Sequence, residues 1–389
     1  MGESLDVLSA PLADHLVLAQ PGPQRGQKLL VLDPLAGWIW QSHRAGLSIT
    51  EIADLLAAHF NLSHHQARND IMALLETWHR EEECGMTVTD PAESPIPVEN
   101  ARPPDPPPAA QTWLLQLADR RVALMVDDPT LAESLARITS HLDAGSLALA
   151  DHHARLGGTA SGWWLAVDDT SIAAGDTFDE AIVRTVSELV ELGCAAAHRL
   201  LVLHAAGVSR SGRGVLLIGR GGAGKTTLAA ALNAEGFGLL GDDVIPVNLD
   251  GQLVGIGMSL CLKSGSWSVL ASRLPNLGRA PLIERAGQSV RFSPPPGPLT
   301  RGPVPVGAFL FPRYQPGGES ALEPLDPMAV LREIVVAEPV VSILDSERLD
   351  TLTRWMQSAP AFALTYAHLD QALALAERAL VESGFPTRD

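Results

Sequence analysis

The chain contains little cysteine and no long apolar run. Cys84, Cys194 and Cys261 are the only cysteines among its 389 residues. They lie far apart and without C-x-x-C spacing, which argues against a disulfide framework and a cysteine zinc site. Apolar runs stay below the roughly 18 residues that span a bilayer. The first residues include Glu3 and Asp6 and lack the basic start of a signal peptide. We therefore expect a soluble, cytoplasmic protein that does not enter a membrane.

Positive charge is also scarce. The sequence has 28 Lys and Arg against 45 Asp and Glu, a formal net charge of −17. Phosphate backbones and anionic membranes repel such a chain, so we expect no nucleic-acid partner. Hydrophobic residues make up 46% of the sequence, and this length and composition are typical of two or three globular domains.

Residues 1–92 combine a strand pattern with amphipathic helix patterns. Short β-like pieces come first, of which 28–33 is the clearest predicted strand, and 34–40 predicts a short apolar helix. Ser48-Ile-Thr-Glu51 and Ser63-His-His-Gln66 are capping boxes, each of which predicts the start of a further helix. One strand followed by three short helices indicates a small winged-helix-like α+β domain.

The segment 93–110 is dense in proline, which neither a helix nor a sheet ladder accommodates, so it predicts a semi-extended linker. Beyond it, 111–389 alternates strand and helix patterns, with apolar strands that read as buried on both faces. Strands are expected at 122–126, 163–167, 200–206 and 361–366, and helices at 178–198 and through most of 349–380. This domain is predicted to be α/β.

The most informative stretch is Val215–Leu228, an apolar strand that runs into a glycine-rich loop and then a helix. Gly219, Gly224, Lys225 and Thr226 fill the pattern G-x-x-x-x-G-K-[ST] of a phosphate-binding loop. Backbone N–H groups of such a loop surround a polyphosphate, and the helix turns its positive end toward it. The predicted nucleotide-binding residues are Gly219, Gly221, Gly222, Ala223, Gly224, Lys225, Thr226 and Thr227. ATP and Mg²⁺ are the expected ligands, with Lys225 on the β/γ-phosphates and Thr226 on the metal.

Two further features lie near this loop in the sequence. Asp242 and Asp243 end the next apolar strand, where carboxylates can bind Mg²⁺ and accept a proton. His204 ends the apolar run 200–203, ahead of the phosphate-loop strand. Paired aspartates also occur in surface turns, and a single histidine on a buried strand is commonly a core residue, so these structural alternatives remain open.

Together these motifs resemble the catalytic domain of HPr kinase/phosphorylases. That family has a His-Gly-type turn, a phosphate loop and then G-x-x-L-x-x-D-D, which correspond to 204–207, 219–226 and 236–243. The resemblance is continuous over about 50 residues and looser over 110–380. It implies a P-loop kinase fold of the HPr kinase and phosphoenolpyruvate carboxykinase type. It also implies that Asp242 takes the hydroxyl proton, that His204 and Lys225 assist catalysis, and that Thr226 and Asp243 hold Mg²⁺.

The later glutamate/arginine motif of that family has no convincing counterpart here. Lys263 and Arg313 end strand-like segments and are the candidates for phosphate or substrate contacts, and an ordinary solvated surface cation is the alternative for each. The missing motif puts a phosphorylase activity in doubt and argues against HPr itself as the substrate.

The first domain is similar to PqqD-like peptide-recognition domains in 32–40, 47–56 and 67–78. Such domains bind a leader peptide as an extra strand at a sheet edge. A DNA-binding helix-turn-helix is the alternative interpretation of this domain. Residues 1–92 carry five Lys and Arg against twelve Asp and Glu, which disfavours contact with a phosphate backbone.

The sequence therefore predicts a peptide-recognition domain (1–92), a linker (93–110) and an HPr-kinase-like domain (111–389). The predicted activity is ATP- and Mg²⁺-dependent phosphorylation of a serine or threonine hydroxyl on a ribosomally made peptide or small protein. A small-molecule kinase, for instance of free serine, and a nucleotide-gated peptide chaperone without phosphoryl transfer are the alternatives. The choice between ATP and GTP is open, as is the oligomeric state, with a homo-oligomer among the options.

Overall fold

The computed structural model describes residues 7–21, 27–60, 62–79, 87–88, 111–145, 150–159, 162–195, 198–337, 340–341 and 344–386. The chain forms two compact units. The first contains Met1–Asp90 and Ile343–Gln357, and the second contains Pro91–Ser342 and Ser358–Asp389. The first division lies near the predicted boundary at residue 92, but nothing in the sequence indicated that 343–357 would join the first unit. The predicted linker, 93–110, lies outside the described residues.

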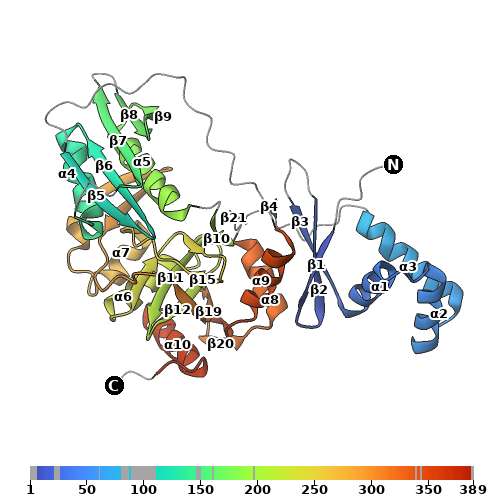
Figure 1. Ribbon diagram of the computed structural model, residues 1–389. Helices are drawn as coiled ribbons and strands as arrows, with labels where there is room; N and C mark the ends of the chain where they lie inside the picture. The colour runs from blue at the N-terminus through green and yellow to red at the C-terminus, as the bar shows by residue number, and fades with distance from the viewer. Residues whose placement is uncertain are drawn as a thin grey trace. The chain divides into compact units, whose positions relative to one another are not determined.

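The first unit is an antiparallel sheet with three helices gathered on one side (Figure 1). The strand order is β1-β2-β3-β4. Its elements are β1 (Leu8–Leu12), β2 (His15–Pro21), β3 (Gln27–Leu32), α1 (Pro34–Arg44), α2 (Ile49–Phe60), α3 (His64–His79), β4 (Thr87–Val88) and, from the later segment, α9 (Ser346–Met356). Short β-like pieces followed by three helices were predicted, and β1–β3 and α1–α3 agree with this outline; the contribution of α9 was not predicted.

Local hydrogen bonds explain where these helices begin. The Asp33 carboxylate accepts a hydrogen bond from the Ala36 N–H at 2.8 Å, and Pro34 occupies the first helical position. At α2 the predicted capping box is present in both directions, since the Glu51 N–H donates to Ser48 Oγ and the Ser48 N–H donates to the Glu51 carboxylate. The hydrogen bonds that the Ser48 N–H and Oγ–H donate to the Glu51 carboxylate lower the pKa of Glu51.

The sheet of the first unit is buried on both faces. Leu16 and Leu18 of β2 pack in one apolar cluster with Ala36 of α1. Alternation places Ala10 of β1 and its pairing partner Val17 on the opposite face, where both are fully buried. Helix α9 packs against β1 and contributes Leu349, Leu352, Trp355 and Met356 as buried residues. The first unit is thus built from two chain segments that are far apart in the sequence.

The second unit begins with a five-stranded sheet in the order β5-β6-β7-β8-β9. Its elements are β5 (Gln111–Leu117), β6 (Arg120–Val126), α4 (Pro129–Thr139), η2 (Ser140–Leu142), β7 (His152–Thr159), β8 (Gly162–Val167), β9 (Thr170–Gly175) and α5 (Phe178–Cys194). The apolar faces of α4 and α5 pack on this sheet around Leu124, Leu135 and Leu165, which are fully buried. The strands predicted at 122–126 and 163–167 are present.

A ten-stranded mixed sheet forms the centre of the second unit. Its main order is β13-β11-β12-β19-β15-β14-β10-β21, and β22 pairs with both β19 and β20. The strands are β10 (Leu201–Leu203), β11 (Ala205–Arg210), β12 (Arg213–Ile218), β13 (Gly238–Gly241), β14 (Ile245–Val247), β15 (Gln252–Leu253), β19 (Val304–Tyr314), β20 (Ala321–Pro324), β21 (Val340–Val341) and β22 (Ala361–Tyr366). The chain is therefore α/β, as predicted.

Helices α6 (Lys225–Ala234) and α10 (Leu369–Glu382) pack with this sheet in one continuous apolar core that includes Leu217, Leu228 and Leu310. A three-stranded sheet, in the order β16-β18-β17, lies in the same unit. The remaining elements are β16 (Leu260–Lys263), α7 (Ser264–Leu270), η5 (Leu277–Arg279), β17 (Leu282–Arg285), β18 (Gln288–Ser293) and α8 (Pro327–Val336).

The single strand predicted at 200–206 is wrong. The structure has two strands, β10 and β11, separated by a bend at His204. Strand β10 pairs with β14 and β21, whereas β11 pairs with β12 and β13. Because β10 and β11 pair with different strands, the backbone changes direction between them. The strand is therefore interrupted at this residue. His204 is consequently exposed and is not the buried core histidine of the structural alternative.

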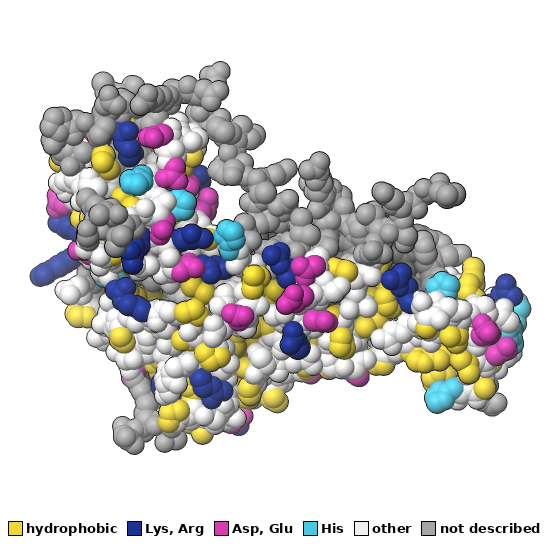
Figure 2. Space-filling view, in the orientation of Figure 1, with side chains coloured by type: hydrophobic (Ala, Val, Ile, Leu, Met, Phe, Trp, Pro, Cys, Tyr) yellow, Lys and Arg dark blue, Asp and Glu magenta, His cyan; other side chains and the backbone are white. Residues whose placement is uncertain are grey.

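On the face drawn in Figure 2, Lys and Arg side chains lie among Asp and Glu side chains and hydrophobic ones across the coloured residues. In the part of the chain that the structure describes, no helix is both long and apolar enough to cross a bilayer.

Candidate functional site

The glycine-rich loop lies between β12 and α6, as its sequence pattern predicts. Gly222 and Gly224 have positive φ values of 83° and 96°, which side chains rarely adopt. A Cβ at Gly221 or Gly222 would meet no atom within 4 Å, whereas one at Gly224 would collide with the Tyr366 hydroxyl. The loop is therefore open at its tip and tightly packed at its base.

Helix α6 begins directly after this loop, and no side chain caps it at Gly224. The first N–H groups of a helix need acceptors, and the helix dipole favours an anion at this end. Tyr366 of β22 donates its hydroxyl hydrogen to the Ala223 carbonyl oxygen at 3.0 Å and so fixes the base of the loop. The loop and the helix start together can surround an anion such as a phosphate group.

Lys225 is buried beneath the loop. Its Nζ donates to the carbonyl oxygens of Gly219, at 2.6 Å, and Arg220, at 3.3 Å. Burial lowers the pKa of Lys225, the negative charge of Asp243 partly offsets this shift, and the positive charge of Lys263 adds to it. An anion at the loop would oppose both lowering effects, because it stabilises the ammonium form.

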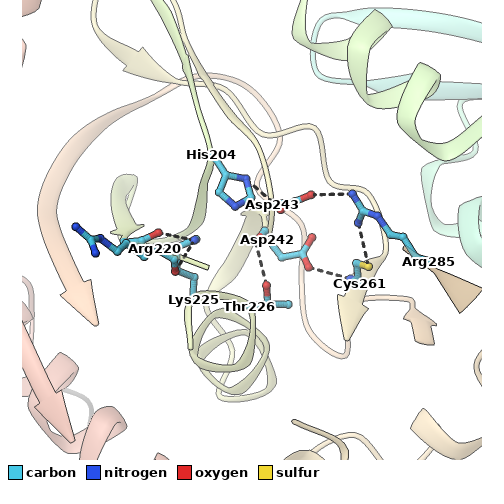
Figure 3. A network of polar contacts seen from close by, with 9 residues as sticks. His204, Arg220, Lys225, Thr226, Asp242, Asp243, Cys261 and Arg285 are labelled. Carbon is cyan, nitrogen blue, oxygen red and sulfur yellow. Dashed lines mark hydrogen bonds and ion pairs between the residues drawn. The ribbon is translucent and has the colours of Figure 1, made fainter. Parts of the chain in front are cut away.

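The second residue of α6 connects the loop to the carboxylate pair (Figure 3). Thr226 donates its Oγ1 hydrogen to the Asp242 carbonyl oxygen at 3.2 Å. Thr227, which the sequence also assigns to the nucleotide, lies half-buried on the same helical turn. Strand β13 ends at Gly241, so the two aspartates follow immediately and lie beside the start of α6.

The two aspartates have different environments. Asp242 is buried, and its Oδ2 accepts a hydrogen bond from the Cys261 N–H at 2.8 Å. Burial, and then the adjacent negative charge of Asp243, raise the pKa of Asp242 to about 7. A carboxyl group that titrates near neutral pH can exchange a proton with a substrate under ordinary conditions.

Asp243 is half-exposed and lies between two basic side chains (Figure 3). Its Oδ1 is 3.2 Å from His204 Nδ1, and its Oδ2 is 3.7 Å from Arg285 Nη2. We call His204, Asp243 and Arg285 the Asp243 cluster. Its members come from the bend after β10, the loop after β13 and the end of β17, so the bend that breaks the predicted strand is what presents His204 to Asp243.

Arg285 and Cys261 were not identified from the sequence. Arg285 Nη1 donates to Cys261 Sγ at 3.4 Å. Burial raises the pKa of the Cys261 thiol to about 11, with the Asp242 carboxylate as the next cause, so this sulfur stays protonated and is a weak acceptor. Neither residue belongs to a recognisable spacing, because both reach the aspartates from the separate three-stranded sheet.

The two candidate phosphate contacts have different surroundings. Lys263, at the end of β16, is exposed and close enough to affect the pKa of Lys225. Arg313, near the end of β19, forms an ion pair with Glu333 of α8 at 2.8 Å. Of these two side chains, Lys263 is therefore the one whose charge affects the pKa of Lys225 at the loop.

A cavity of about 600 Å³ opens beside Arg285. It lies between the first turns of α5 and the turn that joins β17 to β18. Its lining residues are Thr177, Phe178, Asp179, Glu180, Val183, Glu284, Arg285 and Ala286. Arg285 thus borders both the cavity and Asp243.

Thr226 and Asp243 are the candidate metal ligands. Among the described residues, no group of three or more His, Cys, Asp or Glu side chains is arranged to hold a metal ion. Thr226 and Asp243 would supply a hydroxyl and a carboxylate oxygen, which are hard donors of the kind that Mg²⁺ accepts in addition to phosphate oxygens.

In the first unit, β3 has a partly open edge. Strand β4 pairs only with Gln27 and Lys28, so within the described sheet Leu29–Leu32 has backbone pairing from β2 alone. Large apolar side chains are also exposed on the helices of this unit, among them Leu35, Trp38, Leu55, Phe60 and Met72. An edge with free backbone groups can accept an added strand.

Comparison with known families supports this assignment of the first unit. Residues 17–82 match the family described as Coenzyme PQQ synthesis protein D (PqqD). The chain therefore contains an N-terminal PqqD-like domain. No characterised protein was found to match the chain in sequence.

Proposed function

We propose that the protein is an ATP- and Mg²⁺-dependent kinase that phosphorylates a serine or threonine hydroxyl on a ribosomally made peptide or small protein. The observation that carries this proposal is the hydrogen bond from Thr226 to the Asp242 carbonyl, which joins the phosphate loop to the carboxylate pair. An anion-binding loop beside ionisable carboxylates is the arrangement that phosphoryl transfer requires, because positioning and charge stabilisation supply most of the catalysis.

The nucleotide polyphosphate would lie at the open tip of the loop. Positions 221 and 222 leave room for close approach to the backbone, and the uncapped start of α6 supplies N–H donors. Lys225 would exchange its hydrogen bonds with the Gly219 and Arg220 carbonyls for contacts with β/γ-phosphate oxygens. These exchanges favour a polyanion over a neutral ligand.

Thr226 and Asp243 fit a Mg²⁺ ion, since both present oxygen donors and Asp243 is half-exposed. When bound, Mg²⁺ supplies positive charge that neutralises the phosphate oxygens. The His204 imidazole would orient the Asp243 carboxylate through their contact at 3.2 Å.

In the transfer step, the acceptor hydroxyl oxygen forms a new bond to the γ-phosphorus. The bond between that phosphorus and the β–γ bridging oxygen breaks, and ADP leaves with the electron pair. Asp242, whose pKa is raised to about 7, takes the hydroxyl proton. A second assignment is supported by exposure, because the His204–Asp243 pair is accessible whereas Asp242 is buried, and this pair would then accept the proton.

The PqqD-like domain supports a peptide as the substrate. PqqD-like domains bind a precursor peptide, and the open part of β3 is suited to strand addition. A leader segment held there would raise the local concentration of the acceptor to about the millimolar range, as for other short flexible tethers. The site that performs the transfer then needs little affinity of its own for the acceptor.

The test is mass spectrometry of a candidate precursor peptide after incubation with the full chain and Mg-ATP, together with calorimetric titration of Mg-ATP. We expect a phosphorylated serine or threonine in the wild-type reaction. Lys225→Ala should lower the affinity for Mg-ATP at least tenfold and reduce transfer to background, since it removes the buried ammonium group. Arg332→Ala, at an exposed position of α8, is the charge-matched control.

The other two hypotheses give different results in the same experiment. A small-molecule kinase would phosphorylate free serine and leave the peptide unmodified. A peptide chaperone would bind Mg-ATP and peptide but produce no phosphorylated acceptor. Unchanged affinity and transfer in Lys225→Ala would contradict the phosphate-loop assignment itself.

A further inference from the structure

The buried carboxylate of Asp242 is oriented by a backbone group of another sheet. Its Oδ2 accepts a hydrogen bond from the Cys261 N–H at 2.8 Å (Figure 3). Cys261 belongs to β16, whereas Asp242 follows β13 of the ten-stranded sheet. The direction of this carboxylate therefore depends on what holds the chain around Cys261 in place.

The segment that leads into β16 is bonded at Gly257 to both of its neighbours. The Gly257 N–H donates to the carbonyl oxygen of Leu240, in the strand that Asp242 follows, at 2.9 Å. On the other side, the Gly257 carbonyl oxygen lies 2.9 Å from His141 Nε2. Because a carbonyl oxygen can only accept, the imidazole carries a hydrogen on Nε2 and donates it. Gly257 thus joins the strand before Asp242 to η2.

A second bond is made by the hydroxyl of Ser259. This side chain is buried, and its Oγ donates to the Ile138 carbonyl oxygen near the end of α4 at 2.6 Å. The last carbonyl groups of a helix have no partner within the helix, so Ser259 satisfies an acceptor that would otherwise be buried without a bond. Segment 257–261 is therefore fixed to the end of α4 at two points.

The end of α4 is in turn fixed to the five-stranded sheet. Trp113 of β5 donates its Nε1 hydrogen to Thr139 Oγ1 at 3.0 Å. Thr139 is fully buried and donates to the Leu135 carbonyl oxygen at 2.8 Å. The chain of contacts therefore runs from β5 through α4 and segment 257–261 to the carboxylate, although the five-stranded sheet contributes no residue to the loop or to the carboxylate pair.

We propose that Ser259 and His141 are positioning residues for phosphoryl transfer, because they fix segment 257–261 to α4 and so hold the Cys261 N–H against Asp242. This inference rests on the proposed kinase function. In the transfer, the acceptor O–P bond forms, the bond to the β–γ bridging oxygen breaks, and the hydroxyl proton passes to the carboxylate. Proton transfer needs a base within hydrogen-bond reach, and a displacement of about 1 Å can cost roughly a hundredfold in rate.

The first measurement is hydrogen exchange on the full chain, which needs no substrate. Ser259→Ala and His141→Leu each remove one donor that holds the segment. We expect both to raise the exchange rate of the backbone amides at 260–263 about tenfold, because a segment with fewer bonds opens more often. Ser383→Ala is the matched control, since this serine is also buried and donates to a helix carbonyl, that of Ala379 at 2.8 Å, but lies after α10. It should leave exchange at 260–263 unchanged.

The second measurement is steady-state kinetics with Mg-ATP and the precursor peptide that wild type phosphorylates. Ser259→Ala and His141→Leu should lower kcat at least tenfold and change the KM for Mg-ATP by less than about threefold, because the phosphate loop is untouched. His141→Gln can place an amide N–H near the position of Nε2 and should recover most of the lost kcat. Ser383→Ala should match wild type.

Three results would overturn the inference. Unchanged exchange at 260–263 would show that α4 does not hold the segment, and faster exchange with an unchanged kcat would show that the transfer does not need it. Equal losses in kcat and in Mg-ATP affinity would indicate a general distortion of the domain. If wild type transfers no phosphoryl group to a peptide, the proposed function itself fails and this inference fails with it. If wild type is active and the variants match it, only the inference fails.

Discussion

Asp242 is a carboxylate that is buried next to a second carboxylate, and its ionisation should therefore affect the stability of the fold. Its pKa is raised from 3.8 to about 7, first by burial and then by Asp243. Between about pH 4 and pH 7 the folded chain keeps a proton that the unfolded chain has released. The free energy of unfolding consequently falls as the pH rises through this range, and the stabilisation from this residue is complete only below about pH 4.

We predict that Asp242→Asn removes this dependence. The amide oxygen can still accept the hydrogen bond from the Cys261 N–H, and no charge has to be buried. Relative to wild type, the variant should gain stability steadily from pH 4 to pH 7, by a few kcal/mol at about 1.4 kcal/mol per pKa unit. Urea denaturation at pH 5 and pH 8 measures this gain. A difference that does not change with pH would show that Asp242 ionises normally in the folded chain.

Under the proposed kinase function, the same residue should control the pH dependence of phosphoryl transfer. If Asp242 accepts the hydroxyl proton, kcat/KM should rise with pH to a plateau above about pH 7, because only the ionised form is active. Asp242→Asn should then lower transfer by about two to four orders of magnitude while Mg-ATP affinity is largely retained. Asp243→Asn should instead raise the Mg²⁺ concentration needed for activity.

The alternative assignment gives the reverse result. If the His204–Asp243 pair accepts the proton, His204→Gln should lower transfer by about two to four orders of magnitude and Asp242→Asn should leave most of it in place. Normal turnover in both aspartate variants would mean that the pair is only a turn in the chain.

At the scale of elements, the glycine-rich loop between β12 and α6 depends on a strand that follows it far along the sequence. The Tyr366 hydroxyl on β22 donates to Ala223 in the loop, and it lies where a Cβ on Gly224 would be. Strand β22 in turn pairs with β19 next to β12, the strand that leads into the loop. The base of the loop is thus held by an element that follows it by more than a hundred positions.

We predict that Tyr366→Phe weakens Mg-ATP binding several-fold, because the lost hydrogen bond is worth about 1 kcal/mol and its absence lets the loop move. Tyr314→Phe is the control, since that ring lies 5.9 Å from the Tyr366 ring but its side chain is 52% exposed. Calorimetric titration with Mg-ATP measures the affinity of both variants. Equal affinities in the two variants would show that the hydroxyl does not hold the loop in a binding conformation.

The elements that could be predicted from sequence are those determined by neighbouring residues. The strand, glycines and lysine of 215–228 occur within one short stretch, and the Ser48 capping box needs only the residue three positions later. The bend at His204 could not be predicted, since it depends on which strands pair with β10 and with β11. Arg285 could not be predicted for the same reason, because its position beside Asp243 arises from the packing of two different sheets.

At the scale of the whole molecule, the first unit requires two segments that lie far apart in the sequence, Met1–Asp90 and Ile343–Gln357. Ala10 and Leu12 of β1 are fully buried, and α9 packs against that strand. The Ala13 N–H also donates to Gln357 Oε1 at 3.1 Å. A fragment that ends at residue 92 lacks all of these contacts.

We predict that the fragment 1–92 is less stable than a fragment in which 1–90 is joined to 343–357 by a Gly/Ser linker. The joined fragment should unfold cooperatively at a higher temperature, because it covers the apolar face of β1. It should also bind a labelled precursor peptide more tightly by fluorescence polarisation. Equal stability and equal affinity in the two fragments would show that α9 adds nothing to the peptide-recognition unit.

The split composition of the first unit also affects the order in which the protein can fold during synthesis. N-terminal domains usually complete their folding while the ribosome is still making the rest of the chain. Here β1 leaves the ribosome before the second unit is made, whereas the helix that covers it emerges only after most of that unit. The peptide-recognition unit, although most of it precedes the second unit in the sequence, is therefore completed only after most of the second unit has been made, and a nascent chain that stops short of residue 357 exposes its apolar sheet.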